Sequence, residues 1–279
     1  MTTKISPVSD RTAWRLHREV VVLAGWGRAI LLQLAHPLVA QGVSDHSGFA
    51  RDRCGRVRRL QRTLRAMLAL TFGTAEEAAG AAAAINIVHD RVNGRLREGT
   101  SHIGAGTAYS AHDPALLAWV HATLVDTFLL TYERFVAPLS PVERDRYCRE
   151  AGGAAARLGI PPDALPRSTD ELAAYMERML GNGEIVVTGQ ARALAREILW
   201  PGLPWPAGPL LVLARLTTVG LLPPAIRLAY GFTWSRRRER TLRLLTSAVR
   251  HGLPLVPPLV RHWPAARRAA RRERAARPE

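Results

Sequence analysis

Two histidines lie among apolar residues at helical spacing, where an imidazole can bind a metal ion. His89 follows Ile85 by four residues and His121 follows Leu117 by four, so each shares a helix face with an apolar neighbour. Residues 78–84, just before His89, are all alanine or glycine and leave room for another helix or a flat cofactor. Imidazole is the commonest metal ligand. One such histidine is typical of a core residue held by a single hydrogen bond, whereas two on consecutive predicted helices favour a site.

An arginine-rich helix predicted over residues 57–72 also carries chemically capable side chains. On it Arg59, Arg62 and Thr63 stand at i, i+3 and i+4, so they form one strip along the helix. Such a strip can present two guanidinium groups and a hydroxyl to an anion, to a haem propionate or to a bound oxygen species. The alternative is a solvated basic face, which is the common role of a charge run.

His36, Asp45 and His46 are a competing candidate site, for zinc or non-haem iron. Their spacing matches no helix-borne ligand motif, and Pro37 after His36 predicts that a helix ends there and a loop begins. The sequence contains no GxSxG elbow and no glycine-rich phosphate loop. A hydrolase or nucleotide-binding enzyme is therefore not indicated.

Helix signals dominate the elements that must position these residues. The capping-box pattern, a hydroxyl residue followed three residues later by glutamate, begins predicted helices at Thr74, Ser140 and Ser168. Asp113 before Pro114 begins another. Further periodic stretches are expected at residues 11–34, 57–72, 190–200, 208–222, 235–251 and 260–276. The predicted fold is therefore all-α, a single domain of about ten helices.

Strand signals are weak. Residues 185–188 have the β-branched density of a strand, but the stretch is too short and isolated to build a sheet. Residues 36–55 and 99–112 are rich in glycine, histidine and serine and are expected to be loops. Prolines are expected to break the chain at residues 200–209 and 252–258.

The composition excludes a disordered chain and a disulfide framework. Of the 279 residues 47% are hydrophobic, and the two cysteines, Cys54 and Cys148, belong to no CxxC pair, so both are expected to be structural. No uncharged apolar run reaches the ~18 residues of a spanning helix, because Arg28 and Arg215 interrupt the longest ones. The first ten residues lack the pattern of a signal peptide. These features predict a soluble, cytoplasmic protein.

The formal net charge of +16 is concentrated near the end of the chain, where residues 236–279 hold 13 arginines and three glutamates. This segment lacks interleaved aromatic residues and helix-turn-helix or zinc-finger spacing, so specific nucleic-acid recognition is not expected. Residues 265–278 pair alanine with arginine and contain no large apolar side chain. They are expected to be mobile, serving as a solubilising tail or as a peripheral contact with an anionic membrane.

Six motifs follow one another along the chain: LLQLAHPLVAQGVSDHSGF at 31–49, RLQRT at 59–63, FGT at 72–74, VHDRVNG at 88–94, YSAHDPALLAWVHATLVDT at 109–127 and LGIP at 158–161. In this order they resemble the family of the fungal oxygenase MpaB and the bacterial latex-clearing rubber oxygenases. The resemblance implies a haem b oxygenase with an all-α, globin-like core enlarged by extra helices. It divides the chain into a helical lead-in at 1–27, a haem-binding domain at 28–267 and a basic tail at 268–279.

The same resemblance implies roles for the residues singled out above. His89, in the HxxVxG motif, corresponds to the proximal haem ligand that binds the iron. Arg59 and Thr63 correspond to catalytic residues on the distal side, and His121 to a second family histidine near the haem. Rubber oxygenases carry a lysine before that threonine, where this chain has Arg62 beside the cofactor. A guanidinium has no lone pair to offer a metal, so Arg62 is not expected to cap the iron.

The function expected from these features is O₂-dependent oxygenation of an apolar, isoprenoid or lipid-like substrate by a haem b enzyme. Studied members of the family cleave carbon–carbon double bonds of isoprenoid chains with O₂. Two alternatives stay open. One is a haem-binding or sensing protein without turnover, and the other is a cofactor-free basic helical protein that binds anionic membrane or nucleic acid.

Overall fold

The computed structural model describes residues 11–46, 53–201 and 208–276, and for residues 53–60 the backbone alone. Helices account for 73% of the structure, which confirms the all-α prediction. The described part contains fourteen α-helices, more than the ten expected, because the predicted stretches 11–34 and 260–276 each hold two helices and residues 37–46 and 224–229 form helices that were not predicted.

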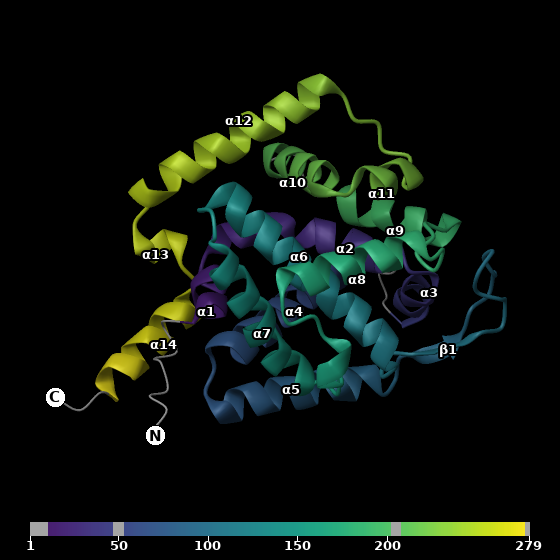
Figure 1. Cartoon of the computed structure of the whole chain (residues 1–279), viewed down its shortest axis with the longest axis horizontal. Helices are drawn as coiled ribbons and strands as arrows, with labels where there is room; N and C mark the ends of the chain where they lie inside the picture. The colour runs from purple at the N-terminus through teal and green to yellow at the C-terminus, as the bar shows by residue number, and fades with distance from the viewer. Residues whose placement is uncertain (1–10, 47–52, 202–207, 277–279) are drawn as a thin grey trace.

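Helix α6, Pro114–Phe135, crosses the centre of the molecule beside α2, Trp26–Leu34 (Figure 1). Helices α10, Gly208–Leu221, and α12, Arg236–Gly252, cover one side of this pair, and α5, Ala75–His89, lies on the other side. The remaining α-helices are α1 (Thr12–His17), α3 (Pro37–His46), α4 (Arg53–Phe72), α7 (Pro141–Ala156), α8 (Thr169–Gly181), α9 (Gly189–Leu199), α11 (Pro224–Ala229), α13 (Pro258–Arg261) and α14 (Pro264–Ala275). The described residues also form the 3-10 helices η2 (Val20–Gly25), η3 (Pro162–Ala164) and η5 (Leu253–Leu255).

The first predicted helix, residues 11–34, is three elements rather than one. Glu19 has extended backbone, with ψ of 116°, and ends the run of α1 before η2 begins. Glycines then let the chain approach its neighbours closely. A Cβ on Gly25 would collide with Thr131 of α6, and a Cβ on Gly27 would collide with Thr218 of α10. The break therefore seats η2 and α2 against two different helices.

Arg28 interrupts an apolar run in the sequence, and its side chain is buried, paired with a carboxylate and hydrogen-bonded. Its guanidinium pairs with the Asp126 carboxylate at 2.7 Å and donates to Thr127 Oγ1 at 2.6 Å and to the Leu221 carbonyl at 2.7 Å. A buried charge is tolerated when it is paired and hydrogen-bonded in this way. Arg28 thus ties α2 to both α6 and the end of α10.

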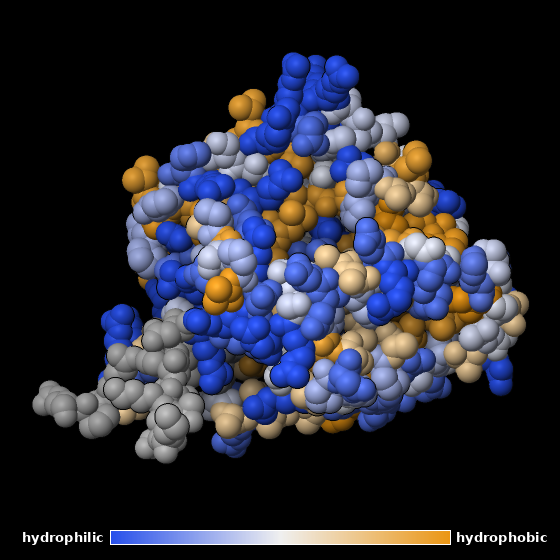
Figure 2. All heavy atoms as spheres, in the orientation of Figure 1, coloured by the Kyte–Doolittle hydropathy of each residue, from blue (hydrophilic) through white to orange (hydrophobic). Residues whose placement is uncertain are grey.

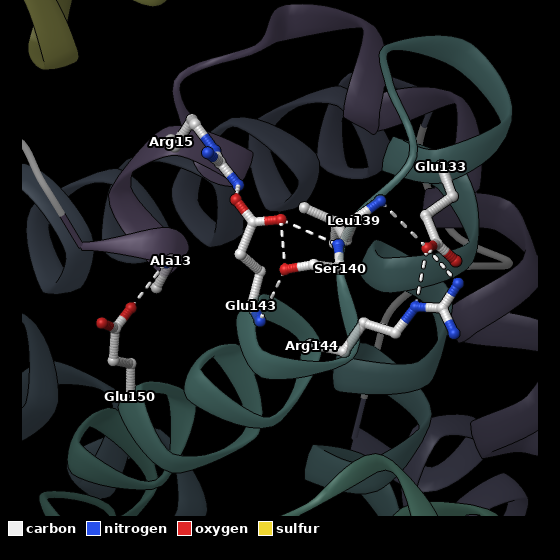
Figure 3. Close-up of polar contacts among 8 residues, drawn as sticks. All are labelled: Ala13, Arg15, Glu133, Leu139, Ser140, Glu143, Arg144 and Glu150. Carbon is white, nitrogen blue, oxygen red and sulfur yellow. Dashed lines mark hydrogen bonds and ion pairs between the residues drawn. The ribbon is translucent and has the colours of Figure 1, made fainter.

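Capping boxes begin α5 and α7 as predicted. In α7 the Ser140 hydroxyl accepts the Glu143 N–H, while the Glu143 carboxylate accepts the Ser140 N–H at 2.8 Å (Figure 3). The same carboxylate binds Arg15 of α1, so the cap also joins two helices. These interactions lower the pKa of Glu143 to about 2. At α8 the Ser168 hydroxyl caps the helix, but Glu171 reaches the Arg167 N–H instead of Ser168.

Loop 36–55 was predicted wrongly, because α3 fills residues 37–46. Pro37 occupies the first helical position, and the His36 carbonyl accepts the Ala40 N–H. The His36 Nδ1 accepts the Leu38 N–H at 3.3 Å, so the histidine caps the helix that follows it. Proline suits the first turn because its missing N–H has no partner there in any case.

The loop predicted over residues 99–112 contains one strand, and a second strand lies just before it. β1, Asn93–Arg95, pairs antiparallel with β2, Ala108–Ser110, in a small hairpin beside α3. Residues 185–188, which had strand composition, form no strand. Three-residue strands leave too little pattern for recognition in sequence.

The basic C-terminal segment was predicted to be mobile, and this prediction is wrong for residues 264–275, which form helix α14 and pack against the fold. Ala266 is buried against Trp14 and Phe72, and Arg272 donates to the Phe72 carbonyl at 2.5 Å. The alanine face lets the helix lie close to two large aromatic rings. The prediction of a mobile tail assumed that a helix needs large apolar residues to pack against a core, whereas here alanines make the contact.

By length and composition α6 alone among the described helices is apolar enough to cross a membrane. Of its most apolar 18-residue window, 67% is buried inside the fold. Residues 20–34 and 37–46 pass the same test only when counted together, as a pair bent by 106°. The burial of α6 matches that of a core helix.

Candidate functional site

The α4–α5 hairpin brings two predicted site residues to one end of the molecule. The helices are joined by the short turn at Gly73 and Thr74 and pack against each other along their lengths. Arg59 lies fourteen residues before this turn and His89 fifteen residues after it, so each is roughly 20 Å along its helix. The backbone therefore places Arg59 and His89 at the same level of the hairpin, at the end away from the turn.

His89 is a half-buried, neutral imidazole at the last position of α5. Burial lowers its pKa below the usual value, and the nearby His112 lowers it further, while Asp90 opposes the shift. The His89 Nδ1 is buried without a hydrogen-bond partner. Buried polar atoms normally have partners. This neutral, unpartnered nitrogen donor suits a metal ligand.

His112 is a residue that the sequence reasoning missed. It lies between β2 and α6, and its ring meets the His89 ring edge-on with centroids 5.8 Å apart. Its Nε2 lies 2.7 Å from the carboxylate of Asp90. In metal sites the ligating histidine itself usually donates its second ring N–H to a carboxylate, whereas here Asp90 holds His112, the neighbour of His89. The sequence does contain two His-Asp pairs, His89-Asp90 and His112-Asp113, and this repetition could have pointed to His112 as a second residue of the site.

Of the predicted arginine strip, Arg62 and Thr63 lie exposed on α4. The side chain of Arg59 lies outside the described residues. The predicted helix is present and extends from residue 53 to 72. The strip thus shares a helix surface, as the spacing required, near the end of the hairpin that carries His89.

His121 lies on α6, seven residues before Phe128 on the same helix face. Burial lowers its pKa to about 4, so its imidazole is neutral at physiological pH. Phe128 faces α4 across a small cavity, which places the His121 face of α6 toward the α4 side of the fold. The inward position predicted for His121 is thereby observed, and its role stays a prediction.

The cavity between η2, α4 and α6 has a volume of about 20 Å³. It is lined by His17, Leu64, Met67, Phe128 and Trp263, among others. Ligand pockets usually measure about 300 Å³ or more, so this space suits a single water molecule. It lies toward the turn of the α4–α5 hairpin, away from His89.

His17, which lines this cavity, makes stability depend on pH. Burial lowers its pKa from 6.5 to about 4, and its Nε2 lies 3.0 Å from the Tyr147 hydroxyl. The unfolded chain therefore binds a proton at His17 more readily than the folded protein does. The neutral, buried His17 contributes fully to the free energy of unfolding above pH 6.5, and this contribution is lost as the pH falls toward 4. We expect the free energy of unfolding at pH 5 to be about 2 kcal/mol lower than at pH 8 from His17 alone.

Urea unfolding of the native protein and of His17→Gln at both pH values checks this expectation. Glutamine can bond the Tyr147 hydroxyl but does not titrate, so its unfolding free energy should change less between the two pH values. Equal pH dependence in both proteins would show that His17 is protonated equally in the folded and unfolded states.

The three residues of the competing metal site lie at opposite ends of helix α3. His36 precedes α3 and Asp45 and His46 end it, so the first is about 13 Å from the others at 1.5 Å per residue. Asp45 accepts the Tyr109 hydroxyl at 2.7 Å and pairs with Arg97, which fixes the β-hairpin on α3. Among the described residues no group of three His, Cys, Asp or Glu side chains is arranged to hold a metal ion. One metal cannot bridge these three residues in this fold.

Cys148 behaves as a structural residue. It is buried in the core within α7, and burial raises the pKa of its thiol to about 12, so no thiolate forms near neutral pH. The side chain of Cys54 lies outside the described residues. Cys148 therefore matches its predicted structural role.

Comparison with known protein families gives one match. The model described as ER-bound oxygenase mpaB/B'/Rubber oxygenase, catalytic domain, matches residues 14–251. This range includes α1 to most of α12 and leaves η5, α13 and α14 outside it. None of the curated proteins and none of the solved structures matches the chain.

Proposed function

The chain belongs to the MpaB and rubber oxygenase family, a family of oxygenases, and from this membership we propose that it is a haem b-dependent enzyme. In this proposal it uses O₂ on an apolar substrate of isoprenoid or lipid-like chemistry. The observation that carries it is the half-buried His89, whose buried Nδ1 has no hydrogen-bond partner and whose pKa is lowered by burial. A neutral imidazole is one of the side chains that can hold a haem iron.

The donor chemistry of the residues at the end of the α4–α5 hairpin fits a haem. His89 would hold the iron, and the His112 ring, held by Asp90, would limit how the His89 ring turns. Arg59 and Thr63, by their family correspondence, would supply a guanidinium and a hydroxyl to the bound oxygen species. Bound haem supplies the iron that activates O₂, and the protein contributes ligation, orientation and exclusion of water.

The purified protein should carry haem b, and its absorption spectrum tests this directly. We expect a Soret band whose intensity corresponds to one haem per chain after reconstitution with hemin. Substrate-dependent O₂ uptake with a short isoprenoid alkene then separates an oxygenase from a haem-binding or sensing protein. A colourless protein that takes up no hemin would contradict the proposal and favour a cofactor-free protein.

Arg62 should leave the iron accessible to added ligands. Its guanidinium cannot donate a lone pair, so we expect the resting ferric protein to bind imidazole readily. In Arg62→Lys the amine can compete for the iron, and imidazole affinity should fall by about tenfold or more as the pH rises toward the lysine pKa. Titration of the Soret band with imidazole measures both proteins.

Arg65→Lys is the matched control for Arg62→Lys. Arg65 is also exposed on this helix but lies three residues nearer the hairpin turn and farther from His89, so this exchange should leave imidazole binding unchanged. If native protein already shows a low-spin spectrum with two side-chain ligands, the iron is capped by another residue and the reasoning for Arg62 is wrong.

A further inference from the structure

An apolar tip, residues 253–260, projects from the molecule between two arginine-rich helices. It reads LPLVPPLV and contains η5 and the start of α13, with no charged residue between His251 and Arg261. Leu255 is 86% exposed, and Leu259 and Val260 are each 68% exposed. Single exposed apolar residues are ordinary, but three within six residues on one tip form a surface that water does not favour.

The tip is held in place at both ends, so its exposure does not come from fraying. On the N-terminal side α12 is anchored by buried Leu242 and Thr246. On the C-terminal side the Arg261 guanidinium makes a two-point ion pair with the buried carboxylate of Glu19, at 2.7 and 2.9 Å. The Trp263 N–H also donates to the Arg18 carbonyl at 3.0 Å. The fold presents this apolar surface on a fixed base.

Positive charge surrounds the tip. Residues 236–276 contain twelve arginines and two glutamates. Hydrophilic residues cover much of α12, and hydrophobic residues reach the surface at the left edge, where Figure 1 places α12 and α13 (Figure 2). The arginines of α14 continue the basic surface on the other side of the tip. An apolar insert bordered by cations is complementary to an anionic lipid surface, which offers hydrocarbon beneath negative headgroups.

We propose that residues 253–260 insert into the surface of an anionic phospholipid bilayer, with the arginines of α12 and α14 on its headgroups. The tip has aliphatic and proline side chains without aromatic rings, so it is not suited to stacking on nucleic-acid bases. The tip itself lies outside the residues 14–251 that the family model matches, and the proposal does not depend on the cofactor. Docking in this way places the protein beside apolar molecules dissolved in the bilayer.

Vesicle co-sedimentation of the full chain tests the insertion. We expect binding to vesicles of phosphatidylcholine and phosphatidylglycerol, mixed about two to one, and much weaker binding to phosphatidylcholine alone. The double variant Leu255→Glu/Leu259→Glu should bind the anionic vesicles about 100-fold more weakly, since burial of each leucine contributes about tenfold. Its thermal unfolding should match that of the native protein, because both leucines are exposed.

Leu228→Glu supplies the matched control. Leu228 is 78% exposed on α11, on the other side of the molecule in Figure 1, so the same exchange there should leave vesicle binding unchanged. Three results overturn the proposal: no binding of native protein to anionic vesicles, equal binding by the tip variant, or a dimer of native protein that the tip variant dissociates. The second result would assign binding to the arginines alone, and the third would make the tip a protein interface.

Discussion

Replacing His89 with alanine is expected to remove haem from the protein while leaving the fold intact. Changes to residues around a metal ligand typically weaken metal binding about 10- to 100-fold, so loss of the ligand itself should exceed that range. His89 is at the end of α5 and half-buried, so the helix should tolerate alanine. Haem content per chain, from the Soret band and extracted haem, measures the loss, and circular dichroism reports the fold.

Added imidazole gives this experiment a second readout. The alanine leaves space where the ring was, so free imidazole should restore haem binding to His89→Ala but not to a variant that has unfolded. His121→Ala should retain haem, and His112→Phe should retain it with weaker affinity. If His121→Ala loses haem while His89→Ala keeps it, the ligand is His121.

Helix starts were predictable because their signals are local. Thr74 and Ser140 each bind the backbone three residues ahead, and Asp113 accepts the N–H groups of Ala115 and Leu116. A side chain that satisfies nearby backbone groups needs no tertiary contact. The beginnings of α5, α6 and α7 could therefore be read from the sequence.

Composition gave wrong predictions for segments whose structure depends on one capping residue or on contacts with distant parts of the chain. Helix α3 has glycine, serine and histidine content typical of a loop, yet His36 and Pro37 supply a cap and a first turn. Helix α14 docks by alanines on Trp14 and Phe72, which lie 252 and 194 residues before Ala266 in the chain. Non-local contacts of this kind leave no spacing pattern in the sequence.

The candidate site was partly predictable for the same physical reasons. Spacing places His89 and Arg59 on their helices, and the short turn between α4 and α5 then brings them to the same end. The approach of His112 to His89 depends on how the β-hairpin folds back, which only the structure shows. Local spacing thus gives the faces of helices, and tertiary structure determines which faces meet.

Replacing Glu19 with alanine is expected to lower the free energy of unfolding by about 3–5 kcal/mol. The Glu19 side chain is fully buried and accepts both bonds of Arg261, while His262 Nε2 lies 3.2 Å away and Arg18 Nε 3.4 Å away. Alanine would leave the partly buried Arg261 guanidinium without its counter-charge, and partly desolvated charge is costly. Urea unfolding at pH 7 measures the change.

Two comparisons separate the buried pair from ordinary surface charge. Arg97→Ala breaks the ion pair with Asp45, but the Arg97 side chain is 71% exposed, so less than about 1 kcal/mol should be lost. Glu19→Ala/Arg261→Met removes both buried partners and should recover much of the stability lost in the single variant. Glu19 binds Arg261, which follows it by 242 residues in the sequence. Loss of this ion pair should therefore also expose residues near 261 to protease. A cost below about 1 kcal/mol for Glu19→Ala would show that burial alone, and not the ion pair, anchors the C-terminal helices.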